Sequence, residues 1–384
     1  MRKLSAGMWS LIMVFGCISA VGQPKPRARD LGIPFDGSPG PLNAITDVKG
    51  VEVGHTTLIS GDGPLKVGAG PVRTGVTAIL PRGRNSKDAV FAGYFSLNGN
   101  GEMTGTHWVE DSGFLDGPVM ITNTHSVGVV RDAVIQWKVK RGEADAEGYW
   151  WSLPVVGETW DGYLNDINGF HVKAEDAIHA LETALSGPVA EGNVGGGTGM
   201  ICNEFKGGIG TASRLLSSKD GSYTVGVLVQ CNYGEREQLR IAGIPVGREI
   251  PGPKIWDDDT GSIIVVVATD APLIPTQLKR LARRVALGLG RDGSYSGDGS
   301  GDLFMAFSTA NPGAIQQKGL RQLTMVPNGQ LDPVFLATVQ ATEEAVINAM
   351  IAAQDMKGAN DHFVPALSHD KLQEVLRKYN RLTK

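Results

Sequence analysis

The sequence predicts an α+β or α/β protein in which sheets lie between layers of helices. Short apolar segments bounded by Gly, Asn, Asp or Pro have the composition of strands, and longer segments repeat apolar residues at a helical period. Several strand candidates, most clearly Ser262 to Val267, are apolar on both alternating faces, which is typical of strands covered on both sides. No break divides the core into two domains. The polar, acidic stretch Pro251 to Gly261 is expected to be an exposed connection.

The strand candidates share a short length and a content of Val, Ile or aromatic residues. They are Thr74 to Leu80, Ala89 to Leu97, Val119 to Thr122, Tyr223 to Cys231, Ser262 to Thr269 and Asp302 to Ser308.

The helix candidates place apolar residues three, four or seven positions apart. The repeats are Val127, Val130 and Val134; Ile178, Leu181 and Leu185 within residues 172–186; and Leu278, Leu281, Val285 and Leu289 after Pro275. The longest helix is predicted from about Pro333 to Met356, and a last short one from Lys371 to Tyr379.

The first residues have the features of an export signal, which we place at residues 1–22. Arg2 and Lys3 precede the apolar stretch from Met8 to Val21, which is short for a membrane span, and Ala20-Val21-Gly22 fits a signal peptidase site before Gln23. Cys17 leaves open a lipoprotein signal instead. We expect a periplasmic or secreted protein without a membrane span, because no later segment is long and apolar enough.

Composition narrows the class further. The formal net charge of −4 argues against a nucleic-acid partner, which would require a basic face. Of the three cysteines, Cys202 and Cys231 lie in apolar strand-like contexts. They could pair in an exported protein, but two cysteines are not a disulfide framework, and we favour two buried thiols. The 52 glycines are dispersed through apolar segments, which suits tight turns and close backbone approaches.

The junction between Gly261 and Ser262 is the most informative point of the chain. A hydroxyl at the start of a buried strand, preceded by glycine and a polar loop, is the arrangement of hydrolases that cut themselves. Attack of Ser262 Oγ on the Gly261 carbonyl would release a chain that begins with Ser262, whose α-amine could then serve as the base for its own hydroxyl. Taken alone, however, the dipeptide is better explained as an ordinary turn before a strand, and the surrounding motifs reverse that preference.

An ordered set of motifs accompanies this junction and resembles the DmpA-type family, which contains the L-aminopeptidase/D-amidase/esterase and the β-peptidyl aminopeptidases. The likeness runs from about Arg29 to about Gln354. Its motifs are Asn98-Gly-Asn-Gly-Glu-Met-Thr-Gly105, Pro154-Val-Val-Gly-Glu-Thr-Trp-Asp-Gly162, Asn193-Val-Gly-Gly-Gly-Thr-Gly-Met200, Val227-Leu-Val-Gln-Cys-Asn-Tyr-Gly234, Gly261-Ser-Ile-Ile-Val-Val-Val-Ala-Thr-Asp-Ala-Pro272 and Ser300-Gly-Asp302.

The resemblance implies a four-layer αββα sandwich like that of N-terminal-nucleophile hydrolases. It implies a chain cut into residues 23–261 and 262–384, and a homotetramer of such pairs. Its substrates would be peptides or amino-acid amides or esters with a free N-terminus.

The resemblance also assigns site residues. Ser262 corresponds to the autocleavage residue and nucleophile, and Asn232 to the oxyanion-hole asparagine. Ser300 and Asp302 match a serine–acid pair that would orient Ser300 or the Ser262 amine, and Glu158 matches the acid that holds the substrate's ammonium group.

Each of these residues also has an ordinary structural interpretation. Asn232 could be a turn residue, Ser300 and Asp302 could cap a strand, and Glu158 could pair with a buried arginine. Trp160 departs from the family pattern because the DmpA aminopeptidase is expected to have a tyrosine there, so the pocket is predicted to be more apolar.

Other motifs do not indicate cofactors. Gly288-Leu-Gly-Arg-Asp-Gly293 satisfies GxGxxG but follows a predicted helix, and Gly195-Gly-Gly-Thr-Gly199 has no Lys-Ser/Thr pair after it, as a phosphate loop requires. The seven histidines lack metal-site spacing, so we expect neither metal nor cofactor.

Two other functions stay open from the sequence. One is an acyltransferase of the ornithine-acetyltransferase type, which also cuts itself, and the other is a non-enzymatic periplasmic binding protein.

Overall fold

Two sheets form the centre of the structure, a computed structural model that describes residues 25–255, 260–316 and 318–383. The predicted signal segment 1–22 with Cys17, the residue Gln23, and the acidic triplet at 257–259 lie outside the described residues. The connection before Ser262 was expected to be exposed, and its residues Pro251 to Lys254 are exposed.

The smaller sheet has four strands in the order β1-β2-β5-β6. β5 runs parallel to the edge strand β6, while the other pairs are antiparallel. The strands are β1 (Glu52–Ser60), β2 (Val72–Leu80), β5 (Val119–Asn123) and β6 (Val155–Thr159).

The larger sheet has six strands in the order β4-β3-β12-β11-β10-β9. Its two central strands, β11 and β12, are parallel to each other, and the remaining pairs are antiparallel. The strands are β3 (Val90–Gly99), β4 (Phe114–Leu115), β9 (Gly208–Leu215), β10 (Thr224–Asn232), β11 (Thr260–Thr269) and β12 (Gly299–Ser308).

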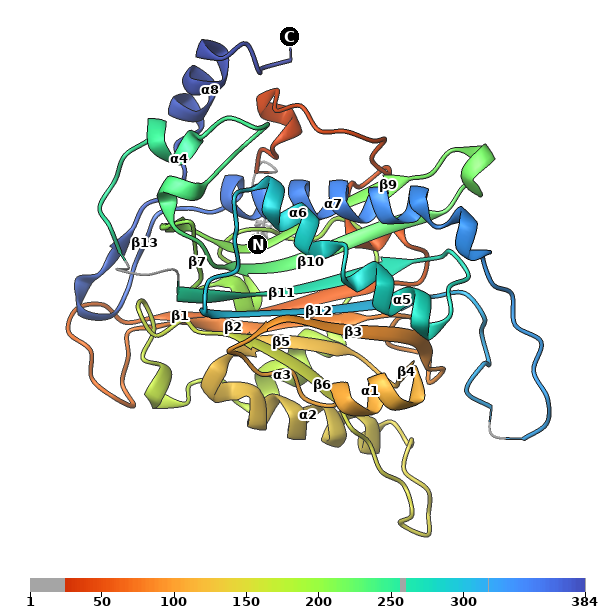
Figure 1. Ribbon diagram of the computed structural model, residues 1–384. Helices are drawn as coiled ribbons and strands as arrows, with labels where there is room; N and C mark the ends of the chain where they lie inside the picture. The colour runs from red at the N-terminus through yellow and green to blue at the C-terminus, as the bar shows by residue number, and fades with distance from the viewer. Residues whose placement is uncertain (1–24, 256–259, 317, 384) are drawn as a thin grey trace, which may run out of the picture.

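Helices cover the outer face of each sheet, so the protein is a four-layer αββα sandwich, as predicted (Figure 1). Helices α5 (Pro275–Ala282), α6 (Val285–Arg291) and α7 (Asp332–Ile351) lie on the six-stranded sheet, and α2 (Val127–Lys140) and α3 (Ala174–Glu182) lie on the four-stranded sheet. Separate apolar clusters fill the two helix–sheet layers and the layer between the sheets.

Smaller elements surround this sandwich. They are helices α1 (Thr106–Ser112), α4 (Val246–Glu249) and α8 (His369–Lys378), and the two-stranded pairs β7 (Ile201–Cys202) with β8 (Phe205–Lys206) and β13 (Met356–Lys357) with β14 (Phe363–Val364).

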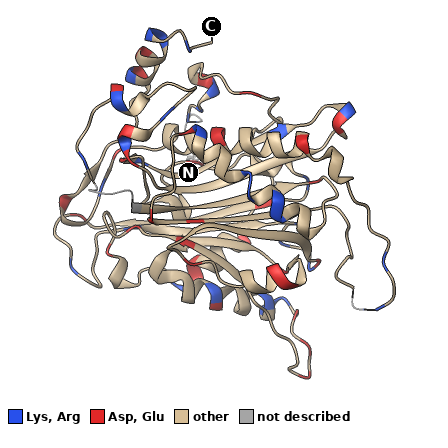
Figure 2. Ribbon diagram, in the orientation of Figure 1, with Lys and Arg blue, Asp and Glu red and all other residues tan. Residues whose placement is uncertain are grey.

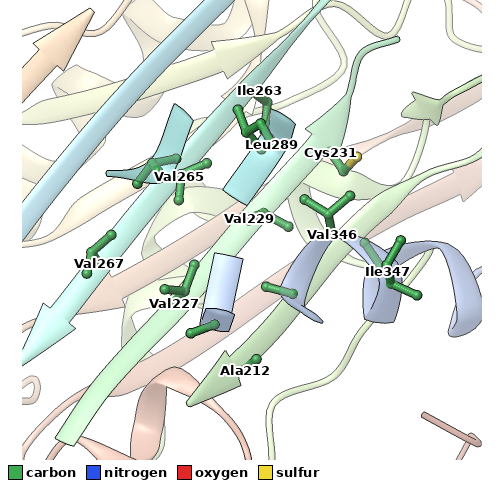
Figure 3. Close-up of a cluster of buried hydrophobic side chains, with 14 of the residues drawn as sticks. Ala212, Val227, Val229, Cys231, Ile263, Val265, Val267, Leu289, Val346 and Ile347 are labelled. Carbon is green, nitrogen blue, oxygen red and sulfur yellow. The ribbon is translucent and has the colours of Figure 1, made fainter. Parts of the chain in front are cut away.

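Strand β11 shows why both of its faces are apolar. Ile263, Val265 and Val267 point toward the helices α6 and α7 (Figure 3), whereas Ile264 and Val266 pack between the two sheets. Successive side chains of a strand point to opposite faces, so Ser262 shares the inter-sheet face with Ile264. Charged residues gather mainly on helices and loops rather than on these central strands (Figure 2).

The predicted helices are present with altered ends. The helix expected after Pro275 is two helices, α5 and α6, separated at Arg283 and Arg284, although its four apolar residues still reach one core. The segment predicted at 172–186 forms a helix only as far as Glu182. Leu185 is exposed and its backbone pairs with Val53, which ends the helix.

The longest helix needs two corrections. α7 ends at Ile351 because the chain then turns into β13 at Met356. Contrary to our expectation, α7 is long and apolar enough to cross a membrane by length and composition, but 89% of that window is buried inside the protein. Its apolarity is therefore explained by its place in the core.

The expectation of two free thiols is wrong. Cys202 and Cys231 form a disulfide, with their Cα atoms 5.7 Å apart. β7 lies against β10, so cysteines that are 29 residues apart in sequence become neighbours.

Candidate active site

Ser262 is the second residue after the start of β11 and lies at one end of the sandwich. Its strand neighbours are Asn232 at the end of β10 and Gly301 on β12. Its side chain is buried and lines a cavity of about 470 Å³. The strand alternation thus directs the hydroxyl between the sheets, toward a space large enough for a small peptide.

Gly261 adopts a conformation that suits glycine. Its φ of +148° lies in a region that other residues rarely adopt, and a Cβ atom there would lie 2.3 Å from the carbonyl oxygen of Asn232. The residue before the predicted nucleophile is therefore held in backbone geometry that a side chain would prevent.

Asn232 is fixed at both ends of its side-chain amide. Its Oδ1 accepts a hydrogen bond from the backbone N–H of Ile201 at 2.8 Å, and its Nδ2 donates to the carbonyl oxygen of Trp160 at 3.0 Å. These partners determine which atom is the nitrogen, and Nδ2 retains a second proton. Asn232 lines the cavity beside Ser262, so it is a held donor rather than a turn residue.

Glu158 lies near the end of the edge strand β6 and borders the same cavity. Its carboxylate accepts hydrogen bonds from the Thr124 hydroxyl at 2.5 Å and from the Glu102 backbone N–H at 2.8 Å. Neither partner is an arginine. Burial raises the pKa of Glu158, an effect that these two hydrogen bonds oppose.

Trp160 follows β6 and forms an apolar wall of the cavity. Its side chain is 43% exposed, and its indole ring lies so close to Gly162 that a Cβ there would be 2.4 Å from the ring. The predicted apolar contribution of Trp160 to the pocket is consistent with this position.

Ser300 and Asp302 lie beside the Gly261–Ser262 peptide but on the opposite face of the sheet. Ser300 is the strand neighbour of Gly261. The side chains of Ser300 and Asp302 point to the same face of β12 as that of Phe304, which packs in the core between the sheet and the helices. Ser300 Oγ donates to Asp302 Oδ1 at 2.6 Å, and Ser296 donates to the other carboxylate oxygen. Both residues are buried, and neither lines the cavity.

The cavity combines these groups in one site. Its other lining residues include Asn100, Gly101, Glu102, Thr124 and Gly299. Among the described residues, the lining carries two carboxylates, Glu102 and Glu158, and no lysine or arginine. A hydroxyl, an amide donor and negative charge thus surround a space that would attract a small cationic molecule.

Comparison with known proteins assigns the family. Residues 43–364 match the profile described as Peptidase family S58. The chain belongs to peptidase family S58.

Curated relatives extend this S58 match over nearly the whole chain. The Beta-peptidyl aminopeptidase BapA of Sphingosinicella microcystinivorans is 55% identical, with 97% of this chain and 96% of the relative covered. The protein of the same name from Sphingosinicella xenopeptidilytica is 49% identical, with 98% of each covered.

A solved structure agrees with the fold. The L-aminopeptidase D-ala-esterase/amidase from Ochrobactrum anthropi, described as a variant of the Ntn hydrolase fold, superposes with a TM-score of 0.89 and 51% identity. The match covers 94% of this chain and all of that chain. This peptidase therefore has an N-terminal-nucleophile hydrolase fold and is similar to serine aminopeptidases.

Sequence reasoning missed three polar residues of the site. Thr124 and Glu102 hold the Glu158 carboxylate, and Ser296 holds Asp302. Glu102 lies inside the motif Asn98 to Gly105. Thr124 follows β5 and Ser296 precedes β12, and neither belongs to a sequence pattern that marks a functional residue. Their roles depend on which chain segments the fold brings together.

The motifs rejected as cofactor loops have structural roles. Gly288 and Gly290 lie within α6, where Gly288 lets the helix approach Thr342 of α7. Gly195, Gly196 and Gly197 are buried against neighbouring strands. Among the described residues, no group of three or more His, Cys, Asp or Glu side chains is arranged to hold a metal ion.

Proposed function

We propose that this S58 peptidase cuts itself between Gly261 and Ser262 and then uses Ser262 as an N-terminal nucleophile to release N-terminal amino acids from peptides, amides or esters. The observation that carries the proposal is the arrangement at the start of β11. Ser262 points into the cavity beside the Asn232 amide, while Gly261 is in a backbone conformation reserved for glycine.

In this proposal, self-cleavage proceeds by an N→O acyl shift. Ser262 Oγ attacks the Gly261 carbonyl carbon, the C–N bond breaks as the C–O bond forms, and the peptide nitrogen takes up a proton. Water then hydrolyses the ester, which leaves a carboxylate on Gly261 and a free α-amine and hydroxyl on Ser262. Glycine at 261 permits the backbone conformation and the close approach to Asn232 that a side chain would prevent.

The freed terminus supports hydrolysis of substrates. An α-amine has a pKa near 8 in its ordinary state, so it can accept the proton of Ser262 Oγ as that oxygen attacks the substrate carbonyl. The second proton of Asn232 Nδ2 is directed at the resulting oxyanion. The leaving amine takes the proton, and water later resolves the acyl-enzyme.

Ser300 and Asp302 act on the amine rather than on the hydroxyl. They lie on the helix side of the sheet, next to the peptide that contains the Ser262 nitrogen. A carboxylate that orients a serine hydroxyl there would hold the α-amine and favour its uptake of a proton during attack.

Glu158 selects substrates with a free amino group. A carboxylate at the edge of the cavity binds an ammonium group by a charge-assisted hydrogen bond, and Thr124 fixes its orientation. We propose β-peptides as the preferred substrates, because two relatives that match nearly the full chain are named β-peptidyl aminopeptidases.

The experiment is a panel of aminoacyl nitroanilides with α- and β-amino acids, assayed with the wild type and with Ser262→Ala. We expect turnover by the wild type, fastest with β-amino acids, and none by the variant, which should also remain uncut. Acetyl transfer to an amino acid without hydrolysis would favour the acyltransferase alternative. Binding without turnover by a single uncut chain would favour the binding-protein alternative.

We also propose export and assembly into a homotetramer. Residues 1–22 would be removed before Gln23, which places the enzyme in the periplasm or outside the cell. A mature N-terminus at Gln23 and four times the protomer mass by light scattering are expected. A lipid-modified N-terminus at Cys17 would overturn the first, and a monomer the second.

A further inference from the structure

Lys206 is a buried titratable group that the proposed mechanism leaves unused, and burial lowers its pKa well below the usual value of a lysine. It lies in β8, is fully buried and belongs to the largest side chains of the interior. Among the described residues no carboxylate lies within ion-pair distance of its Nζ. A lysine buried in this way requires a reason, because an ammonium group loses its hydration on burial.

Within the described part of the chain, the Lys206 amino group donates only to backbone carbonyls. Nζ donates to the carbonyl oxygens of Met200 at 2.5 Å, Gly207 at 2.9 Å and Gly197 at 3.4 Å. Three backbone acceptors thus surround the amino group, which fixes the head group and the turn that supplies Gly197 and Met200. The glycine-rich motif at 195–199 therefore surrounds a lysine rather than a phosphate.

One of these carbonyls leads directly to the active site. The peptide group between Met200 and Ile201 makes two hydrogen bonds. Its oxygen accepts a hydrogen bond from Lys206 Nζ, and its N–H donates a hydrogen bond to Asn232 Oδ1 at 2.8 Å. A peptide group is planar, so a donor that holds its oxygen also fixes the direction of its N–H. Hydrogen bonds joined in this way strengthen one another.

The other contacts of Asn232 hold its side-chain amide in the same orientation, with Nδ2 toward the cavity. Nδ2 donates one proton to the Trp160 carbonyl, and the other is left for the cavity beside Ser262. The disulfide joins Cys202 to Cys231, which are the neighbours of Ile201 and Asn232 in sequence, and so keeps the two partners of the Ile201–Asn232 hydrogen bond together.

We propose that Lys206 is a positioning residue for the oxyanion hole, which holds and polarises the Asn232 amide through the Met200–Ile201 peptide group. This role rests on the proposed function of Asn232. As negative charge develops on the substrate oxygen, protonation of Lys206 becomes more favourable, and its N–H groups behind the amide make Nδ2 a better donor. Lys206 touches no substrate, so its removal should affect the transition state and leave substrate binding unchanged.

The test compares Lys206→Met with a matched control, Lys138→Met. Lys138 is also a buried lysine, but its Nζ is 3.0 Å from Asp116 and 3.3 Å from Glu143, and it lies on α2, under the other sheet. Both variants should lose stability. Only Lys206→Met should lower kcat, by about 10- to 100-fold, the range expected for a misplaced catalytic donor, with KM within about twofold of the wild type.

Rates are measured per cleaved active site, counted by intact mass, so that slow self-cleavage is not mistaken for slow turnover.

The double variant with Asn232→Ala is decisive. If Lys206 acts through Asn232, Lys206→Met causes no further loss of kcat in that background. Lys206→Gln, which keeps donor hydrogens without the charge, should have an intermediate kcat, and it decides the question alone if the Met variant does not fold.

The outcomes separate this inference from the proposed function. Wild-type kcat in a folded Lys206→Met or Lys206→Gln, or a loss that multiplies with that of Asn232→Ala, would overturn the role of Lys206 while the hydrolase assignment stands. Absence of turnover by the cleaved wild type with every substrate would instead overturn the proposed function, and this inference with it.

Discussion

On the inter-sheet face of β11 and β10, Ser262 and Asn232 border a cavity of about 470 Å³, whereas Ser300 and Asp302 on the helix face are buried and do not line that cavity. The nucleophilic oxygen and the serine–acid pair are thus separated by the sheet itself. Ser300 is the strand neighbour of Gly261, so the pair lies beside the backbone that precedes Ser262. In the proposed mechanism, the cavity face therefore binds the substrate and stabilises the oxyanion, while the helix face controls the proton on the amine.

The largest effect expected on the cavity face is that of Asn232→Ala. Removing one oxyanion donor should lower kcat by about 10²- to 10³-fold, with a small change in KM, because the interaction forms mainly in the transition state. Steady-state kinetics per cleaved active site checks this. Wild-type turnover in a folded variant would remove Asn232 from the mechanism.

The helix face is tested by Asp302→Asn, which keeps the size of the side chain but removes its charge. We expect kcat to fall by about 10²-fold and the pH dependence of kcat to shift, while KM stays near the wild-type value, since the pair does not line the cavity. Ser300→Ala should change kcat in the same direction. A large rise in KM without a change in kcat would contradict the separation of the two faces.

Glu158→Gln tests recognition of the substrate amine. Loss of a charge-assisted hydrogen bond worth about 1.5 kcal/mol should raise KM by about tenfold. Burial raises the pKa of Glu158. As the pH falls, Glu158 therefore loses its charge at a higher pH than an ordinary glutamate does, and the KM of the wild type should begin to rise at that higher pH. The variant should lose this dependence.

A substrate control accompanies that variant. The wild type should not hydrolyse an N-acetylated nitroanilide at a measurable rate, because the acetyl group removes the ammonium. Equal hydrolysis of blocked and free substrates would show that Glu158 does not select the amine.

The smallest effect is expected from Glu102→Gln. Its carboxylate borders the cavity but is exposed, so its attraction for a cationic substrate is screened by water, and KM should rise by about twofold. Glu110→Gln is the control, because Glu110 pairs with Lys279 outside the cavity lining. An equal change in both variants would mean a general effect of surface charge.

The fold and most of the site could be predicted from the sequence. The alternation of Ile and Val in β11 was visible, and the resemblance of the motifs located Ser262, Asn232, Glu158 and Ser300. Strand β6 was not predicted, because only five residues form it and three of them are Gly157, Glu158 and Thr159, whose burial depends on neighbouring segments.

The remaining features depend on contacts between distant segments. The disulfide requires β7 to lie against β10, and the Lys206 contacts require a turn of glycine backbone around a side chain six residues later. No residue pattern in one segment records such a contact. For the same reason, the sequence does not reveal that Ser300 and Asp302 lie on the other face from Ser262.

Intact-mass spectrometry of the purified, active enzyme tests the central claim most directly. We predict two polypeptides, one that ends at Gly261 and one that begins at Ser262, with activity that increases in proportion to the cleaved fraction. A single unbroken chain that hydrolyses the nitroanilides at full rate would contradict the account.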